Sequence, residues 1–184
     1  MQVKRQLCDK LIGECETVLK RIKLGIDTVC DKTNPDAALA FCFANKAIDL
    51  QYRWARGQPF RHRPFQLAYI LMCIESIVNK KSEYRNSCDL MWVPTGTGKT
   101  EAYLLLIAFV TALRRIRGAK EGTRWFGVDV ITRYTLRLLT IQQFRRALGV
   151  ITAMEHLRAG SADLPPGRTQ DELGTQPFGI GIWV

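Results

Sequence analysis

The most informative stretch of this sequence is Leu90-Met91-Trp92-Val93-Pro94-Thr95-Gly96-Thr97-Gly98-Lys99-Thr100. An apolar segment leads into a loop of small residues, and a lysine, a hydroxyl and a long apolar helix follow. The two glycines allow the backbone to curl so that successive N–H groups point inward at an anion. The helix that begins near Thr100 adds the positive end of its dipole at the same place. The order of strand, glycine loop and helix therefore predicts a phosphate-binding P-loop.

The residue types in this loop predict nucleotide chemistry. We expect Lys99 to reach the β- and γ-phosphates of ATP and the Thr100 hydroxyl to ligate Mg²⁺, so these two are the predicted catalytic residues. Val93 stands where the strict pattern Gly-x-x-x-x-Gly-Lys-Ser/Thr has its first glycine. The alternative interpretation is a chance Gly-Lys-Thr run in a surface turn. The predicted cofactor-binding residues of the loop are Thr95, Gly96, Thr97, Gly98, Lys99, Thr100 and Glu101.

The composition is typical of a globular protein with a substantial core. The chain has 184 residues, of which 47% are hydrophobic, enough for one α/β domain with a helical appendage. A formal net charge of +10 favours a polyanionic partner, although many basic proteins bind none. The six cysteines and two histidines lack the spacing of a zinc site, and such cysteines fit a reducing, cytoplasmic compartment.

No membrane segment is expected. The N-terminus leads directly into an amphipathic pattern and has no apolar signal-peptide region. The longest apolar run, residues 102–113, is too short to cross a bilayer. The chain is therefore predicted to be soluble, without a membrane partner.

Helices are predicted on the N-terminal side of the loop. Two amphipathic helices are expected over residues 4–29 and 36–54, joined by a turn in which Asn34 is the cap and Pro35 the first helical residue. We expect them to form a helical hairpin within an N-terminal helical region of residues 1–57, and simple packing support is the plainest role for it. A third helix is expected over residues 63–79.

Three apolar segments, residues 88–93, 127–131 and 178–184, are predicted to be strands of a parallel sheet. The helix from Thr100 to Arg117, ended by Gly118, would then be the crossover of a βαβ unit. Arg114, Arg115 and Arg117 are interpreted as cations that suit the end of that helix. A further helix is expected over residues 135–157. Because the chain ends within an apolar segment, we expect a fragment or the product of a truncated gene.

The element Arg63-Pro64-Phe65-Gln66 precedes the loop by one helix. The Gln66 amide can donate to N7 of adenine and accept from its exocyclic amine, a pair of bonds that guanine cannot make. Phe60 or Phe65 could stack beside the base. The alternative is an ordinary helix start with an exposed glutamine.

A second element, Ile131-Thr132-Arg133-Tyr134-Thr135-Leu136, follows the predicted strand next to the loop. Ligands bind at the carboxyl ends of strands in open α/β sheets. We expect Arg133, helped by Thr132, to contact the phosphates of a nucleic acid. Arg137 and Arg145 could extend this basic track, or they are simply solvated charges.

These motifs together resemble the first RecA-like lobe of a superfamily-two helicase. The likeness is nearest to the large helicase-like subunit of DISARM-type antiphage systems, and it covers about residues 36–184. It is carried by three stretches, at residues 41–47, 133–144 and 177–184. The resemblance implies an α/β fold, a partial RecA-like parallel sheet with flanking helices over residues 58–184. It also implies ATP-driven translocation on DNA within a multi-subunit defence complex, with ATP and Mg²⁺ as cofactors.

The chain departs from the helicase pattern in one important respect. The Asp-Glu motif that should follow an apolar strand is absent, because Asp171-Glu172 lies in a polar loop. An arginine finger, which can contribute a factor of about 10³–10⁵ in rate, would need a second lobe. We therefore expect this chain alone to bind ATP weakly and to hydrolyse it negligibly. Two alternatives stay open: another P-loop enzyme such as a small-molecule kinase, and a non-catalytic scaffold that uses the N-terminal helices.

Overall fold

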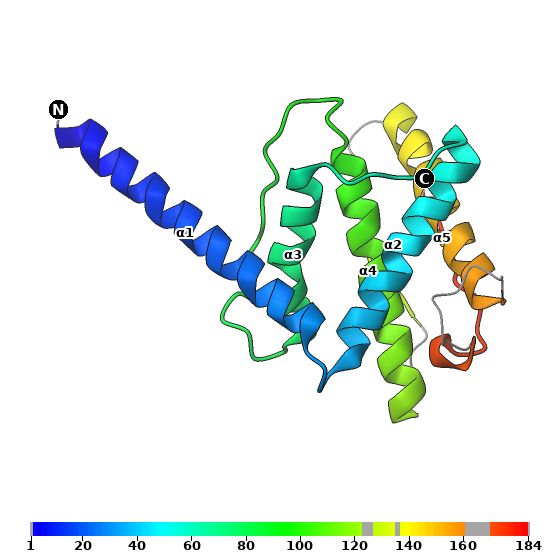
Figure 1. Cartoon of the computed structure of the whole chain (residues 1–184). Helices are drawn as coiled ribbons and strands as arrows, with labels where there is room; N and C mark the ends of the chain where they lie inside the picture. The colour runs from blue at the N-terminus through cyan, green and yellow to red at the C-terminus, as the bar shows by residue number, and fades with distance from the viewer. Residues whose placement is uncertain (1, 123–126, 135–136, 161–169, 184) are drawn as a thin grey trace.

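The structure, a computed structural model, describes residues 2–122, 127–134, 137–160 and 170–183. Regular structure in these ranges is entirely helical (Figure 1). The helices are α1 (Gln2–Cys30), α2 (Pro35–Arg56), α3 (Pro64–Val78), α4 (Lys99–Glu121), α5 (Arg137–Arg158) and the short 3-10 helix η1 (Gln170–Leu173).

The helix boundaries follow local sequence signals. Asn34 occupies the N-cap position of α2 with Pro35 in the first turn, and Gly57 ends that helix in the left-handed conformation at φ +70°. Pro64 opens α3. The predicted end of the fourth helix at Gly118 is wrong, because α4 continues to Glu121 and Gly122 ends it at φ +61°.

The predicted α/β fold with a parallel sheet is wrong, because the described residues contain no strand. Over their described residues, the three segments expected to be strands are irregular, and each has at least one large apolar side chain that is strongly exposed. Leu90 is 82% exposed, Ile131 86% and Trp183 98%. A strand is completed by backbone bonds to a neighbouring strand, and a local apolar pattern does not supply that neighbour.

Each of these segments is held by a different helix instead. Asp89 accepts two hydrogen bonds from Arg21 of α1, and the Val128 carbonyl accepts one from Arg114 of α4. The Phe178 N–H donates to Glu155 of α5. The segments are therefore side-chain-anchored connections.

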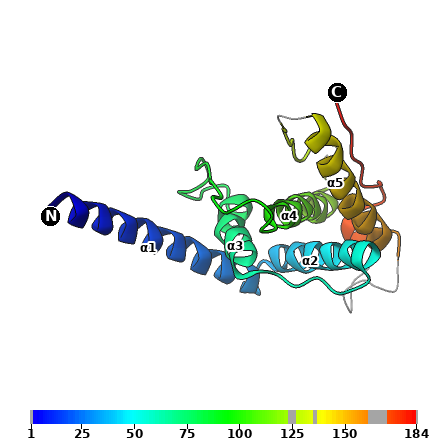
Figure 2. The same cartoon turned by 90° about the horizontal axis from the view of Figure 1, so that it is seen from above.

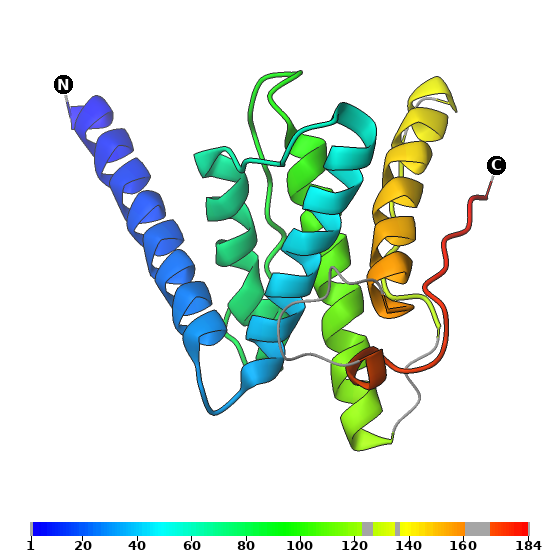
Figure 3. The ribbon, with the colours of Figure 1, turned by 45° about the vertical axis from the view of Figure 1, so that its right-hand side comes forward.

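The two N-terminal helices agree closely with the predicted ranges but diverge from their turn (Figure 3). α1 packs chiefly on α3, and α2 packs on α4 and α5. Gly25 allows α1 to approach α3 closely, since a Cβ there would lie 1.8 Å from the Leu71 carbonyl oxygen. The predicted helical hairpin is thus a V of two helices that pack on different neighbours.

One hydrophobic core joins α2, α3, α4 and α5. It therefore takes residues from both sides of position 57, and α4 runs through its middle (Figures 1 and 2). Its largest fully buried side chains include Phe43, Ile70, Leu105, Phe109 and Leu157.

Two arginines of α4 donate hydrogen bonds to backbone carbonyls of other segments of the chain. Arg117 donates to the Val78 carbonyl at the end of α3. Arg115 is 7% exposed and donates to the carbonyls of Gln176 and Pro177 at 2.6 and 2.8 Å. The interpretation of these residues as cations at the end of the helix is wrong, because α4 continues to Glu121 and their partners lie far away along the chain.

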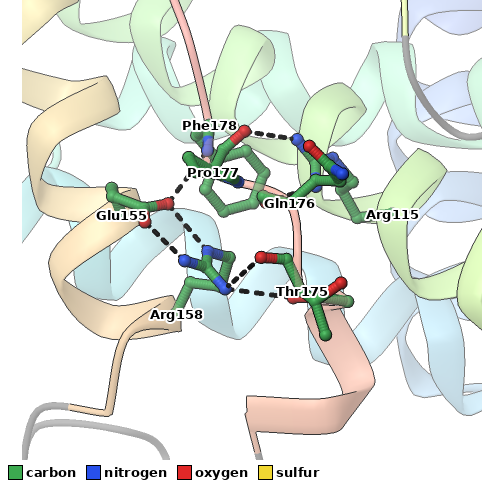
Figure 4. A network of polar contacts seen from close by, with 8 residues as sticks. Arg115, Glu155, Arg158, Thr175, Gln176, Pro177 and Phe178 are labelled. Atoms are coloured by element: carbon green, nitrogen blue, oxygen red, sulfur yellow. Dashed lines mark hydrogen bonds and ion pairs between the residues drawn. The ribbon is translucent and has the colours of Figure 1, made fainter.

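The C-terminal segment 174–178 is fixed against α4 and α5 (Figure 4). The Arg115 guanidinium lies 4.7 Å from the centroid of the Phe178 ring. Arg158 pairs with Glu155 and donates to the carbonyls of Gly174 and Thr175, both at 3.2 Å. Phe178 itself is buried in the core.

Candidate functional site

The loop that opens α4 has the backbone of an anion-binding turn. Gly96 and Gly98 adopt φ values of +81° and +91°, which other residues rarely tolerate. Gly98 is the N-cap of α4 and supplies no side-chain cap. The first amide N–H groups of a helix have no partner within the helix, so this end of α4 can donate them to an anion.

Lys99 is directed into the loop. Its amino group donates to the Val93 carbonyl at 2.5 Å and to the Pro94 carbonyl at 3.1 Å. The Thr97 hydroxyl also donates to Pro94, at 2.8 Å. The ammonium thus lies among carbonyl oxygens, which are acceptors of the kind a phosphate group could replace.

The start of α3 packs against the loop. Gln66 is 2% exposed; its Nε2 donates to the Gly98 carbonyl at 2.7 Å, and its Oε1 accepts from the Arg63 N–H at 2.8 Å. The Arg63 guanidinium donates to the Thr97 carbonyl at 3.0 Å. The structure therefore brings the Arg-Pro-Phe-Gln element and the loop together. Both polar atoms of the Gln66 amide bond within the chain, and its role toward adenine stays a prediction.

Gly98 sits in a narrow space. A Cβ at this position would lie 2.8 Å from Gln66 Nε2 and 3.2 Å from Glu101 Oε2. Glu101 forms an ion pair with Arg146 of α5 through its other oxygen. Its Oε2 is buried without a hydrogen-bond partner, so the site holds an unused carboxylate acceptor next to the loop.

The Thr-Arg-Tyr element is irregular and precedes α5. Burial raises the pKa of Tyr134, the charge of Arg146 opposes this rise, and Tyr103 of α4 adds to it. Thr132 and Arg133 precede Tyr134 and are exposed.

The remaining predicted residues are more scattered. The Phe60 ring makes edge contacts with Tyr52 and His62, at centroid distances of 5.3 and 4.8 Å. Thr95 is exposed and Thr100 is half-buried. Arg145 is exposed, whereas Thr135, Leu136 and the side chain of Arg137 lie outside the described residues.

Sequence reasoning missed Arg146. It lies 45 positions from its partner Glu101, and no motif spacing links the two. The sequence alone does not distinguish Arg145, which is exposed, from Arg146, which pairs with Glu101 beside the loop.

The described part of the chain contains neither a cluster of metal ligands nor a membrane-spanning helix. No three His, Cys, Asp or Glu side chains come together there as a metal site. No described helix is both long and apolar enough to cross a membrane.

The loop, its lysine and its helix define the class of site by geometry: a glycine turn at a helix N-terminus, with a lysine directed into it, on a helical scaffold. The chain is homologous to part of a curated relative, the DISARM protein DrmA of Bacillus paralicheniformis. The two are 35% identical over an alignment of 197 residues, which covers 98% of this chain and 17% of the relative. No family profile matches the chain, and no solved structure matches it.

Proposed function

We propose that this chain is the ATP-binding part of a DISARM-type antiphage defence protein that moves along DNA at the expense of ATP. The observation that carries the proposal is the glycine loop at the start of α4, in a chain 35% identical to a DISARM protein DrmA. Because the chain spans 17% of that relative, hydrolysis and movement belong to the longer protein.

Lys99 and the first amides of α4 bind the phosphates in this proposal. The Lys99 ammonium exchanges the Val93 and Pro94 carbonyls for the β- and γ-phosphate oxygens. The Thr100 hydroxyl would hold Mg²⁺, and Glu101 Oε2, which has no hydrogen-bond partner in the structure, would be a further acceptor beside it. Hydrolysis needs a group that positions the attacking water, which we assign to the rest of the protein.

Arg133 is the proposed contact to the DNA backbone. It is exposed and lies directly before Tyr134 in the Thr-Arg-Tyr element. The net charge of +10 favours such a polyanion.

Nucleotide binding is tested by titrating the 184-residue chain with a fluorescent ATP analogue in the presence of Mg²⁺. We expect Lys99→Ala to weaken binding by about tenfold to hundredfold, because a charge-assisted bond contributes about 1.5–3 kcal/mol. The matched control is Lys80→Ala, which removes an exposed lysine elsewhere. Equal affinities for the two variants would refute the assignment.

DNA binding is tested by measuring affinity against salt concentration. In Arg133→Ala, the slope of log K against log salt should become shallower by the amount expected for the loss of about one phosphate contact. Arg61→Ala, also at an exposed arginine, is the control and should leave the slope unchanged. An unchanged slope in Arg133→Ala would remove this residue from the DNA site.

A further inference from the structure

The N-terminal half of α1 projects from the rest of the molecule (Figures 1 and 2). Every residue from Lys4 to Lys20 is exposed. An isolated helix is marginal in water unless one of its faces is packed against something. The question is therefore what covers this half of the helix.

An apolar seam runs along α1 with alternating spacings of four and three. It consists of Cys8, Ile12, Cys15, Leu19, Ile22, Ile26 and Val29. In heptad terms, Ile12, Leu19 and Ile26 take position a, and the other four take position d. The three a residues are 56%, 51% and 43% exposed.

The contact with α3 uses another face of the helix. Gly25 lies against Leu71 of α3, and Arg21 is buried against Asp89. At 100° per residue, the centre of the seam lies roughly 110° around the axis from these two residues. Val29, at the base, already packs on the core, so the free part of the seam runs from Cys8 to Ile26.

We infer that this seam pairs with the α1 seam of a second copy of the chain as a parallel, in-register coiled coil. Parallel pairing places each a or d residue opposite its own copy, so every layer from Cys8 to Ile26 is apolar. β-branched isoleucine at two of the three a positions favours two strands.

The charges beside the seam support the same orientation. In a parallel pair, a g residue faces the e residue of the next heptad on the other chain. Lys4 at g therefore faces the partner's Asp9, and the symmetric pair forms on the other side. The next two g positions are Leu11 and Val18, so no g–e pair in this register brings like charges together.

The first test is the mass of the chain in solution at tens of micromolar concentration, measured by light scattering. We expect twice the 20.9 kDa of one chain. The variant Ile12→Asp/Leu19→Asp should have the mass of one chain. The control Gln6→Asp/Thr17→Asp adds the same charges to the same helix off the seam and should keep the doubled mass. Circular dichroism checks that all of these proteins stay helical.

The second test uses the native cysteines at d. With Cys30, Cys42 and Cys88 changed to Ser, the remaining exposed thiols are Cys8 and Cys15. Parallel pairing puts each beside its own copy, so diamide should oxidise two thiols to one disulfide, taking up two electrons and two protons. When Cys8 and Cys15 are also changed to Ser, adding Thr17→Cys places a thiol off the seam and should give no such product.

Three results would overturn the inference. A single-chain mass for the unaltered protein removes the second copy as the occupant. A doubled mass without disulfides at Cys8 and Cys15 removes the parallel register. A mass that stays doubled in Ile12→Asp/Leu19→Asp places the contact elsewhere.

Discussion

Two irregular segments of this molecule are held by the same kind of contact. In the loop at residues 94–98, the Pro94 carbonyl accepts from Lys99 and the Thr97 carbonyl accepts from Arg63. In segment 174–178, Arg115 and Arg158 do the same. Both segments lack strand or helix partners for these carbonyls, so cationic side chains supply the donors.

The segments differ in how accessible these donors are. Arg115 is 7% exposed, and its guanidinium also covers the Phe178 ring. Arg63 is exposed and Lys99 half-buried, so solvent and ligands reach them more easily. Buried donors make a permanent clamp, whereas accessible donors at a helix N-terminus can exchange a carbonyl for a phosphate.

The largest effect should come from opening the clamp. Arg115→Ala leaves the Gln176 and Pro177 carbonyls without this donor and uncovers Phe178, which should cost about 4 kcal/mol in the free energy of unfolding. Lys99→Ala should cost about 1 kcal/mol or less, because its bonds are accessible to water. Urea unfolding measures both. Similar losses of unfolding free energy in Arg115→Ala and Lys99→Ala would contradict the proposed difference between the buried and the accessible donors.

The segment that leads into the loop should behave like the clamp. Arg21 and Asp89 form a largely buried ion pair with bonds of 2.5 and 2.8 Å. Arg21→Ala should cost about 3 kcal/mol, because it leaves the Asp89 carboxylate without its cation. Chemical denaturation gives this value, with the exposed Arg61→Ala as the control. If Arg21→Ala left the free energy of unfolding unchanged, the ion pair before the loop would contribute no more to stability than the accessible bonds of Lys99 do.

Two glycines separate backbone strain from crowding within the loop. Gly98→Ala should cost about 2 kcal/mol, because a Cβ meets the Gln66 and Glu101 side chains at a left-handed φ. Gly96→Ala should cost about 1 kcal/mol, since nothing lies within 4 Å of its Cβ position. Thermal unfolding compares the pair. The reverse order would contradict the packing around Gly98.

Acid should loosen the clamp at segment 174–178. The bond from Arg158 lowers the pKa of Glu155, a shift that burial opposes and the Phe178 N–H supports. Because the folded-state pKa is depressed, this stabilisation is complete above the ordinary value of 4.5 and is lost as the pH falls through the lowered pKa.

Glu155→Gln should therefore lose about 1 kcal/mol at neutral pH and show a weaker loss of stability below pH 4.5. Urea unfolding over a pH series measures this dependence. Glu121→Gln, at an exposed carboxylate, should retain the wild-type pH profile. The same profile in Glu155→Gln would show that this carboxylate does not supply the acid sensitivity.

The helices could be predicted from sequence because their signals are local. Asn34-Pro35 and the apolar periodicity around Leu67 and Ile74 place α2 and α3 within a few residues. The end of α4 was missed because Gly118 is tolerated in a buried helix interior, while Gly122 takes the left-handed φ.

The sheet and part of the site could not be predicted because they depend on distant neighbours. The apolar segment before the loop is typical of a strand, but the structure ties it to α1 through Asp89. The contact between Gln66 and the loop is easier to anticipate, because Gln66 lies in the first turn of α3 and the loop follows α3 along the chain. The ion pair between Glu101 and Arg146 depends on how α5 crosses α4, which no short motif encodes.

The most direct measurement is amide hydrogen exchange of the whole chain with and without Mg²⁺ and ATP. We expect the amides of residues 95–101 to exchange rapidly alone and to be protected when nucleotide is added, while residues 174–178 stay unchanged. Protection in the loop should vanish in Lys99→Ala and persist in Lys80→Ala. Exchange in residues 95–101 that ATP leaves unaltered would contradict the account.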